Sequence, residues 1–305
     1  MDARRLGVGL NLPQAFLTDA AVDYLSDHDY NSLSEAWAEQ AYAELARPVH
    51  GKQAPLRRVN THPRRTPKAP PLDAPPAQAG PAFRLADFLE QHGRTARRLV
   101  CPPASFWHAA HDHLTHPDSL VNLANAAERR HRLQWAHHLR QQAADAGDLR
   151  ALTEVAMTRE RRGDRKGAEA AALQAADAGD VYALVELAIG REETGDRESA
   201  ETLALKAAEA DEDFALTHLI QTREEAGDRK GAENLALKAA QAGEPYALIE
   251  LAITREKAGD QESAETLARQ AADAGHIDVL LPERLRPWSL WPDGLDPDGT
   301  PTPPW

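Results

Sequence analysis

The sequence predicts an all-α protein whose main part is a right-handed α–α superhelix, a solenoid of 32-residue helix-turn-helix repeats, preceded by a small helical N-terminal segment. The first observation is that four copies of one pattern follow each other without a gap over residues 143–270. Units that repeat at such a period cannot bury their apolar faces alone and must stack. The second observation is a central Gly-Asp pair that divides every copy into two amphipathic halves; these pairs begin at Gly163, Gly195, Gly227 and Gly259.

The second copy shows why each half is expected to form a helix. Asp180 is a candidate N-cap, and Leu184 and Leu187 follow it on one helical face. Gly195 permits the left-handed turn that ends this helix, and Asp196 can cap the next one. The second helix has small apolar residues at helical spacing: Ala200, Leu203, Ala204, Ala207 and Ala208. Each unit is therefore expected to be two antiparallel helices of about 13 residues, roughly 20 Å long.

The period extends beyond the four copies on both sides. Residues 111–142 form a fifth copy whose central pair is His131-Arg132, as expected of a degenerate repeat at the end of an array. Past the fourth copy another one begins, and Pro282 stops its first helix. The array is therefore expected to be capped at both ends.

The flanks differ from the array in composition. In the N-terminal segment, Ser32 and Glu35 form a candidate capping box ahead of an apolar helical face. The next stretch has nine prolines and seven Lys or Arg, which is typical of an extended linker. In the tail, Trp288 and Trp291 are expected to cover the end of the solenoid. The predicted parts are a helical segment at 1–46, a basic Pro-rich linker at 47–82, a helical lead-in at 83–110, five repeats plus an aborted capping helix at 111–281, and a Pro/Gly/Trp-rich tail at 282–305.

The composition argues against several classes of protein. A net charge of −13 disfavours a general nucleic-acid binder, which needs a basic face to displace counterions. The single cysteine, Cys101, allows no internal disulfide. No run of about 18 apolar residues is present, and the first residues lack the apolar core of a signal peptide. We therefore expect a cytoplasmic protein that does not act at a membrane.

Motifs for catalysis are missing from the sequence. It has no phosphate-binding loop of the Gly-x-x-x-x-Gly-Lys-Ser/Thr type, no Gly-x-Ser-x-Gly elbow and no His-Glu-x-x-His. His108, His111 and Asp112 stand at i, i+3 and i+4, which could place zinc ligands on one helical face. No cysteine at metal-ligand spacing accompanies them, so a helix surface is the favoured interpretation. We expect no catalytic residue, no cofactor and no metal.

An arginine column is the same in all four copies, at Arg159, Arg191, Arg223 and Arg255. It could serve as a ladder for an acidic ligand. In the interpretation that we favour, each stem covers apolar surface while the guanidinium pairs with a glutamate of a neighbouring helix. The candidate partners are Glu169, Glu201, Glu233 and Glu265.

The columns that vary on the first helices are the candidates for recognition of a partner. Aromatic and aliphatic residues beside acids would form a groove for a protein segment or peptide with basic residues. In the alternative interpretation, the aromatic residues pack between repeats. The candidate partner-binding residues are Tyr182, Val185, Glu186 and Ile189; Phe214, Thr217, His218 and Gln221; and Tyr246, Ile249, Glu250 and Ile253.

The array resembles tetratricopeptide repeats and their Sel-one-like relatives. The resemblance lies in the run Ala-Ala-x-Ala-Gly-Asp-x-x-Ala-Leu-x-x-Leu-Ala, closed by Gly-Asp-x-x-x-Ala-Glu. The sequence departs from that pattern in its period of 32 residues and in lacking the Trp and Tyr signature of ordinary tetratricopeptide repeats. Repeats of this kind imply a surface that binds proteins.

The flanks look like parts of large actinobacterial signalling NTPases of the STAND type. Residues 1–60 resemble the region behind their ATPase module, residues 83–93 resemble the segment before their helical repeats, and residues 294–305 resemble their C-terminal tail. The resemblance implies that the chain corresponds to the back half of such a protein, without its nucleotide site. In that family the repeats are taken to bind a trigger while the ATPase switches, so an ATPase encoded nearby is an expected partner.

Three functions follow from these observations. The first is a non-catalytic interaction scaffold or sensor module of a bacterial signalling system, with a protein or peptide bound on the face of the first helices. The alternative is a nucleic-acid-associated regulator that contacts phosphate through the basic linker at 47–68. The third is a metal-dependent enzyme centred on His108 and His111.

Overall fold

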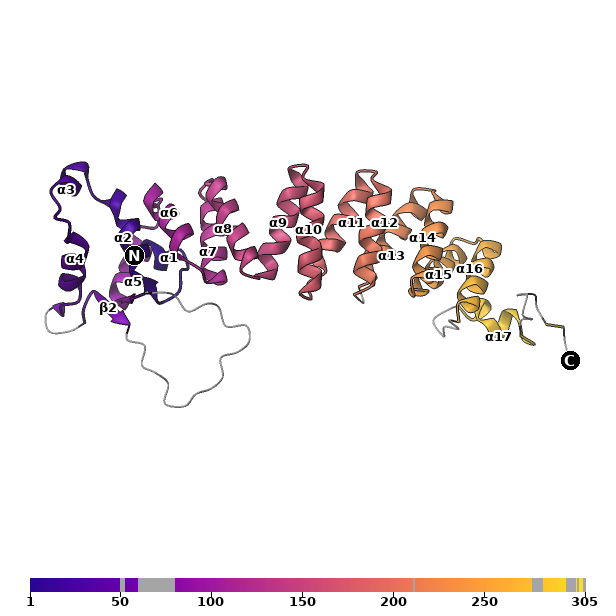
Figure 1. Cartoon of the computed structure of the whole chain (residues 1–305). Coiled ribbons are helices and arrows are strands. Elements are labelled where there is room, and N and C mark those ends of the chain that lie inside the picture. The colour runs from indigo at the N-terminus through magenta and orange to yellow at the C-terminus, as the bar shows by residue number, and fades with distance from the viewer. Residues whose placement is uncertain are drawn as a thin grey trace. The chain divides into compact units, whose positions relative to one another are not determined.

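The computed structural model describes residues 1–49, 53–59, 80–210, 212–275, 282–294, 300, 302 and 303. Within the repeats of each unit, helices that follow each other in the chain pack against one another, which confirms the predicted all-α repeat solenoid (Figure 1). The chain divides into two compact units, Met1–Val155 and Ala156–Trp305, and the boundary falls inside helix α9 (Leu149–Arg161).

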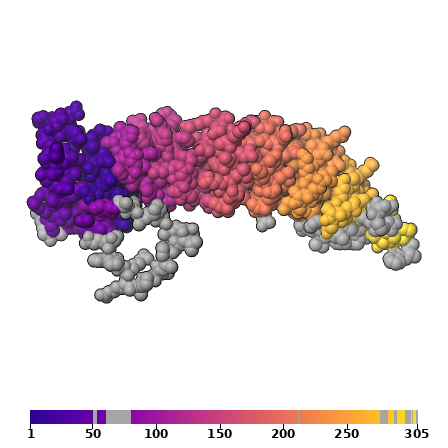
Figure 2. Space-filling view, in the orientation of Figure 1, coloured from indigo at the N-terminus to yellow at the C-terminus, as the bar shows by residue number. Residues whose placement is uncertain are grey.

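In the C-terminal unit, pairs of helices follow each other in the order that the period predicts. The first helices of successive pairs also pack directly on one another, α11 on α13 and α13 on α15, so they form a continuous layer. Figure 2 shows the side chains of these pairs, in pink to orange, filling the space between successive helices on the visible face. After α9, the helices are α10 (Arg165–Asp177), α11 (Tyr182–Glu193), α12 (Arg197–Ala208), α13 (Phe214–Glu225), α14 (Arg229–Gln241), α15 (Tyr246–Lys257) and α16 (Gln261–Asp273).

The Gly-Asp pairs form the turns within each helix pair, as predicted. At Gly195, with φ of 84°, the first helix ends in a Schellman motif, because the Asp196 N–H donates to the Arg191 carbonyl at 2.9 Å. The side chains of Asp164 and Asp228 then cap the next helix, each accepting a backbone N–H three residues on at 3.0 Å.

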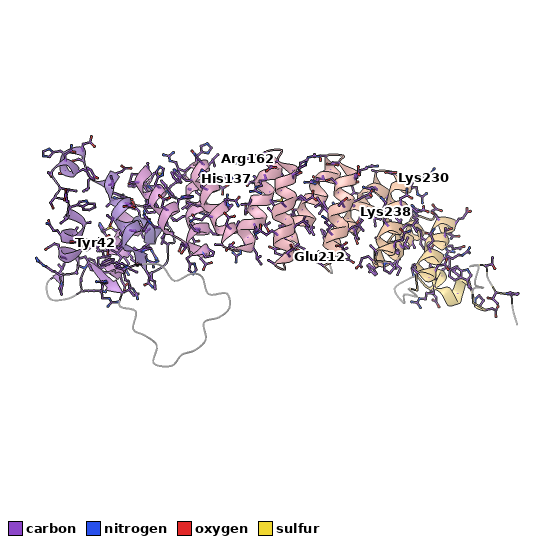
Figure 3. All side chains as sticks on the ribbon, in the orientation of Figure 1. Tyr42, His137, Arg162, Glu212, Lys230 and Lys238 are labelled. Carbon is purple, nitrogen blue, oxygen red and sulfur yellow. The ribbon has the colours of Figure 1, made fainter. Side chains whose placement is uncertain are left out.

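The two kinds of turn lie at opposite edges of the helix stack. In Figure 3, Arg162 and Lys230, which flank turns within pairs, lie along the upper edge of the C-terminal unit. Glu212, which lies in a turn between pairs, is at the lower edge of the same unit. The alternation keeps all first helices in one layer.

Leucine and alanine build the core of this unit. Leu184, Leu216 and Leu248 occupy one column of the repeat and are each 1% exposed. Ala200, Ala232 and Ala264 lie on the second helices and are fully buried. Alanine lets two helix backbones approach closely, which explains why an aromatic content of only 5% suffices for a packed interior.

The tail closes the last helix pair. Its described part contains η3 (Glu283–Leu285) and α17 (Pro287–Leu290). Leu285 is fully buried, and Trp291 is 7% exposed with the Arg269 guanidinium 5.4 Å from its ring centroid. The expectation that Trp291 covers the end of the array is therefore met, while the side chain of Trp288 and residues 276–281 lie outside the described residues.

The N-terminal unit combines helices with a small antiparallel sheet. The strands are β1 (Leu12–Pro13), β2 (Leu56–Val59) and β3 (Ala82–Leu85), in the order β1-β3-β2. Leu56 pairs with Leu85, and Leu12 pairs with Phe83. The helical elements of this unit are α1 (Asp2–Arg5), α2 (Gln14–Ala21), η1 (Val22–Tyr24), α3 (Asp27–Asn31), α4 (Trp37–Leu45), α5 (Asp87–Ala96), α6 (Ala104–His113), α7 (Pro117–Glu128) and α8 (Leu133–Asp145).

The structure corrects two local predictions in this unit. Strand β2 lies inside the range 47–82 that the sequence indicated as a linker, because Leu56 joins Phe83 and Leu85 in a small apolar cluster. The proposed capping box at Ser32 does not form; its hydroxyl donates to the Asp29 carbonyl at 2.7 Å, and α4 begins at Trp37 without a side-chain cap. Residues 60–79 of the predicted linker lie outside the described residues.

Candidate functional site

The first helices of the C-terminal unit carry a stripe of exposed aromatic residues. Tyr182 opens α11 and is 58% exposed, and Phe214 opens α13 and is 56% exposed. Tyr246, at the start of α15, is half-buried. Two of the three aromatic rings are therefore not packed between repeats, and large exposed apolar side chains in register mark a surface suited to contact with another molecule.

Two candidate residues of this face belong to the core instead. Val185 is 6% exposed and Ile249 is 2% exposed. Thr217, in the same column, is half-buried. The remaining candidates stay at the surface, with Ile189 and Ile253 half-buried and Gln221 exposed.

Acidic groups stand one helical turn after the aromatic rings. Glu186 follows Tyr182, and a hydrogen bond from the phenol to this carboxylate raises the pKa of Tyr182. Glu250 likewise stands four residues after Tyr246. In the middle repeat the acid is replaced by His218, whose ring stacks on Phe214 with centroids 6.0 Å apart.

The charge of this unit is strongly negative, and its cations are mostly paired within the helix stack. Residues 156–305 contain 17 Lys and Arg against 31 Asp and Glu, a net charge of −14, whereas the whole chain carries −13. Several exposed arginines pair with the Asp of the next turn, as Arg197 does with Asp228. Within the described residues, no cation pairs with Glu186, Glu193 or Glu250. We call the surface with Tyr182, Phe214, Tyr246, Glu186 and Glu250 the first-helix face. Its carboxylates can therefore pair with cations of another molecule.

Three arginines of the column, Arg191, Arg223 and Arg255, are buried and link successive repeats, whereas Arg159 is half-buried. Arg223 is 3% exposed and forms a bidentate pair with Glu192 of the preceding repeat, at 2.8 and 2.7 Å. Its remaining nitrogen, Nη1, donates to Glu201 at 2.6 Å. Arg255 repeats both contacts one period later, with Glu224 at 3.2 Å and Glu233 at 3.1 Å. These arginines have no free donor face for a ligand, so the structural interpretation of the column is confirmed.

The main partners of this column were missed in the sequence. The predicted acids Glu201 and Glu233 are the second contact of each arginine, whereas the bidentate partner is the acid of the previous repeat. A signal was present, because glutamate follows every arginine of the column directly. These acids are Glu160, Glu192, Glu224 and Glu256.

The tail supplies the last member of this arginine ladder. The period would place the next arginine at position 287, which is Pro287. Instead, Arg284 of η3 binds Glu256, with Nε–Oε1 at 2.7 Å, and also binds Glu265. The tail therefore imitates a further repeat at the point where the array stops.

Replacing Arg284 with Ala is expected to loosen the end of the array. Glu256 and Glu265 would lose their shared cation, so amide hydrogens of α16 should exchange faster while those of α11 and α12 stay unchanged. Hydrogen-exchange mass spectrometry would measure this, with Lys257→Ala as an exposed control near the same end. Equal exchange in both variants would show that Arg284 does not hold the tail in place.

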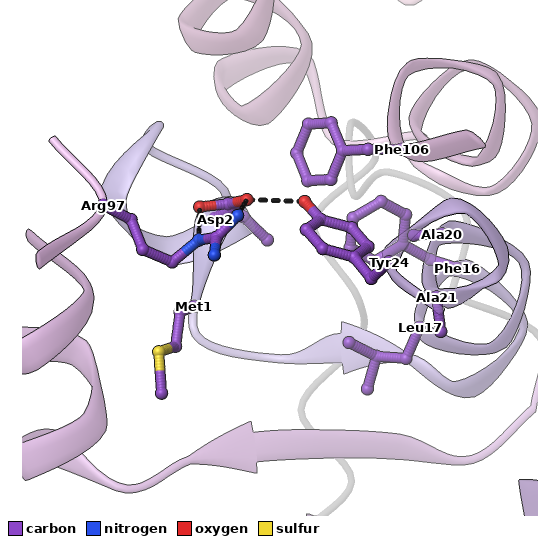
Figure 4. Close-up of a pocket in the computed structure, with 10 residues that line it drawn as sticks. Met1, Asp2, Phe16, Leu17, Ala20, Ala21, Tyr24, Arg97 and Phe106 are labelled. Carbon is purple, nitrogen blue, oxygen red and sulfur yellow. Dashed lines mark hydrogen bonds and ion pairs between the residues drawn. The ribbon is translucent and has the colours of Figure 1, made fainter. Parts of the chain in front are cut away.

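The N-terminal unit contains a buried ionic cluster beside a cavity of about 290 Å³ (Figure 4). Asp2 is 5% exposed and accepts hydrogen bonds from Arg5 at 2.6 Å, Arg97 at 2.8 Å and the Tyr24 hydroxyl at 2.5 Å. Burial alone would raise the pKa of Asp2, but these bonds outweigh it and lower the pKa to about 2. The neighbouring wall is apolar, with Phe16 and Leu17 among its residues. Three donors of the chain itself satisfy the buried carboxylate, which is typical of a structural element.

The histidine cluster is spread over the surface of α6 and its neighbours. His111 pairs with Asp112 at 2.9 Å, and His113 contacts Asp19 at 2.6 Å. The His108 ring packs edge-on against Trp135, with centroids 4.5 Å apart. Across the described residues, no three His, Cys, Asp or Glu side chains come together as a metal-binding group.

Comparison with protein-family models gives no match for this chain, and comparison with curated proteins gives none either. The resemblance to tetratricopeptide and Sel-one-like repeats and to STAND-type NTPases therefore rests on the quoted residues.

Within the described ranges, no helix has the length and apolar character needed to span a bilayer. Of the basic linker, Arg57 and Arg58 are described and lie exposed on β2.

Proposed function

We propose that this chain is a non-catalytic interaction scaffold, and that the first helices of its C-terminal unit bind a basic segment of a partner protein. The observation that carries the proposal is the combination of exposed aromatic rings at Tyr182 and Phe214 with carboxylates at Glu186 and Glu250 that have no cation partner among the described residues. Aromatic anchors supply most of the binding energy of such surfaces, and complementary charge supplies orientation and rate.

The continuous layer of first helices favours a long ligand over a compact one. Because α11, α13 and α15 pack directly on one another, their exposed residues lie on neighbouring parallel stripes. A helix or extended segment that crosses these stripes meets an aromatic residue on each of three helices. A partner with aliphatic residues between Lys or Arg fits this pattern.

The role in bacterial signalling is part of the same proposal. It is supported by the resemblance of residues 1–60 and 83–93 to STAND-type NTPases. An ATPase encoded next to this chain is the partner that the resemblance suggests, with the repeats acting as its sensor or scaffold. Copurification of the two proteins from a common expression vector would test this part.

Binding of a basic peptide tests the site itself. The probe is a labelled amphipathic helical peptide of about 15 residues built from Lys, Leu and Ala, a length that spans the groove of a helix-binding surface. Fluorescence anisotropy with the full chain should show binding that weakens about tenfold or more in the double variant Tyr182→Ala and Phe214→Ala. Both side chains are exposed, so the melting temperature should hardly change.

A second pair of variants separates the specific face from general acidity. Glu186→Gln with Glu250→Gln should weaken the same peptide severalfold, mainly at low salt. The matched control is Glu198→Gln with Glu262→Gln, which removes two exposed acids from the second helices. Equal losses in the two pairs would mean that the peptide responds to net charge, and the proposed face would be wrong.

A further inference from the structure

The turn between α7 and α8 departs from every other turn within a helix pair. In the later pairs the turn is Gly-Asp, whereas here it is His131-Arg132, preceded by Arg129 and Arg130. The backbone is unchanged, because the Arg132 N–H donates to the Ala127 carbonyl at 2.9 Å as in the glycine turns. His131 therefore adopts φ of 56°, a left-handed conformation that a β-carbon disfavours.

The same exchange removes a helix cap. Arg132 is the N-cap of α8 and makes no side-chain hydrogen bond there, whereas Asp164 and Asp228 cap the equivalent helices of later repeats. Both changes are locally destabilising, and both bring imidazole or guanidinium groups to one turn. The sequence has the stabilising Gly-Asp pair at four later turns, but it has the destabilising His-Arg pair at this turn.

Within the part of the chain that the structure describes, the cations of this turn have no acidic partners. Among the residues that the structure describes, no carboxylate forms an ion pair with Arg129, Arg130 or Arg132. Arg130 is half-buried and donates to the Ala126 carbonyl at 2.8 Å. Burial, and then the positive charge of Arg5, lower the pKa of its guanidinium. The turn is therefore a concentration of positive charge that no carboxylate of the described residues neutralises in an ion pair.

Exposed aliphatic side chains lie beside this charge. Leu99 is 89% exposed and Val100 is 41% exposed, in the segment that follows α5. Residues 5–7 join the two segments, because the Arg5 guanidinium donates to the Val100 carbonyl and the Asn122 side-chain amide of α7 donates to the Gly7 carbonyl at 3.0 Å. The lowering of the Arg130 pKa by the charge of Arg5 agrees with this placement. The preceding residue, Arg98, is exposed and likewise lacks an acidic partner within the described ranges.

We propose that Arg98, Leu99 and Val100, together with Arg129, Arg130 and Arg132, form a docking surface for an acidic protein segment with apolar side chains. Unpaired arginines would meet its carboxylates, and arginine is enriched where planar, bidentate recognition of carboxylate is needed. Leu99 and Val100 supply the apolar contact that nucleic-acid phosphates would not use. This surface belongs to the N-terminal unit and has the opposite charge preference from the first-helix face, so it does not depend on the proposed function.

Introducing the Gly-Asp turn of the later repeats gives the sharpest test, because it should stabilise the protein while weakening binding at the proposed surface. In the full chain, His131→Gly with Arg132→Asp is expected to raise the melting temperature by about 2–4 °C. The probe is a labelled peptide of about 15 residues built from Glu, Leu and Ala, and its Kd should rise about tenfold. A stabilised variant that binds the probe as well as the parent would overturn the proposal.

A matched pair of double variants controls for charge. Arg129→Gln with Arg130→Gln should also weaken the Glu/Leu/Ala peptide about tenfold. Arg161→Gln with Arg162→Gln, at the equivalent turn one period later, should change the Kd by less than about twofold, since surface charges away from a contact contribute little. Similar losses in both pairs would show that net charge alone attracts the peptide, against the proposal.

Leu99→Ser distinguishes a protein ligand from nucleic acid. It should weaken the Glu/Leu/Ala peptide severalfold, because it removes the most exposed aliphatic contact. Titration of the parent chain with a duplex DNA of about 20 base pairs is expected to show at least tenfold weaker binding than the peptide at physiological salt. Tighter binding of the duplex, unaffected by Leu99→Ser, would replace the proposed acidic partner by nucleic acid.

Discussion

Replacing Arg223 with Met is expected to lower the free energy of unfolding of the C-terminal unit by about 3–5 kcal/mol. The methionine side chain would fill the space of the aliphatic part of Arg223. Glu192, which is 8% exposed, would however lose both hydrogen bonds from the guanidinium. Glu201 would lose its short contact as well. A buried carboxylate without a cation is costly, because desolvation is no longer offset by pairing. Urea denaturation followed by circular dichroism measures the difference.

An exposed arginine of the same unit provides the control. Arg197 pairs with Asp228 at the surface, so Arg197→Gln should cost less than about 1 kcal/mol. The double variant Arg223→Met with Glu192→Gln should recover part of the loss, since it removes the unpaired charge. If Arg223→Met were as mild as Arg197→Gln, the buried ladder would not be what joins successive repeats.

Asp2→Asn is expected to have a similar effect in the N-terminal unit, about 3–5 kcal/mol at neutral pH. The substituted amide would have the same shape but no charge, so Arg5 and Arg97 would be left close together without the anion that both now contact. The Tyr24 hydroxyl would also lose an ionised acceptor. Chemical denaturation of the full chain measures the change, and an unaltered C-terminal unit by hydrogen exchange would localise it.

The loss should depend on pH in a defined direction. The pKa of Asp2 in the folded chain is about 2, below its ordinary value of 3.8, so the folded state favours the ionised form. Its stabilising effect is therefore complete above about pH 5 and declines as pH falls from about 4 toward 2. Parent and Asp2→Asn chains should differ most near neutral pH, and the difference should shrink by about 2 kcal/mol as the pH falls to about 2. A difference that persists undiminished at low pH would contradict the ionic origin of the effect.

The C-terminal unit could be predicted from the sequence because its information is local and repeated. Gly195 and Asp196 define a turn through interactions a few residues apart, and the same pair recurs at every period. Repetition also makes the pattern more reliable, because leucine recurs at the position of Leu184 in every copy. Such a column indicates burial more firmly than a single leucine does. The ladder was predicted only in part, since the pairing of Arg223 with Glu192 depends on how one repeat is placed on the next.

The N-terminal unit could not be predicted in the same way. Residues 56–59 have no strand pattern of their own. They form β2 because they pair with β3, where Leu56 lies opposite Leu85. Likewise, Ser32 and Glu35 match a capping box in spacing, yet α4 begins only at Trp37. Short elements in a single copy depend on distant partners, and propensity is then a weak guide.

The candidate site was predicted to the level of columns but not of individual side chains. Periodicity selected the varying positions of the first helices, and Tyr182 and Phe214 are indeed exposed there. It could not separate Val185 and Ile249, which are buried, from Thr217 in the same column. A pattern within one repeat does not contain the packing of the next repeat, so it cannot give the burial of each position in a column.

The arginine ladder also has a consequence for how the array can change in evolution. Each rung joins an arginine to a glutamate 31 positions earlier, in the preceding repeat. Loss of one whole period, for example residues 180–211, would bring Arg223 opposite Glu160 in the place that Arg191 now holds. Recombination in steps of 32 residues therefore preserves the pairing of each buried guanidinium, whereas loss of part of a repeat would leave a buried charge without its partner. Arrays of this kind can gain or lose repeats by gene rearrangement while each intermediate remains a folded protein.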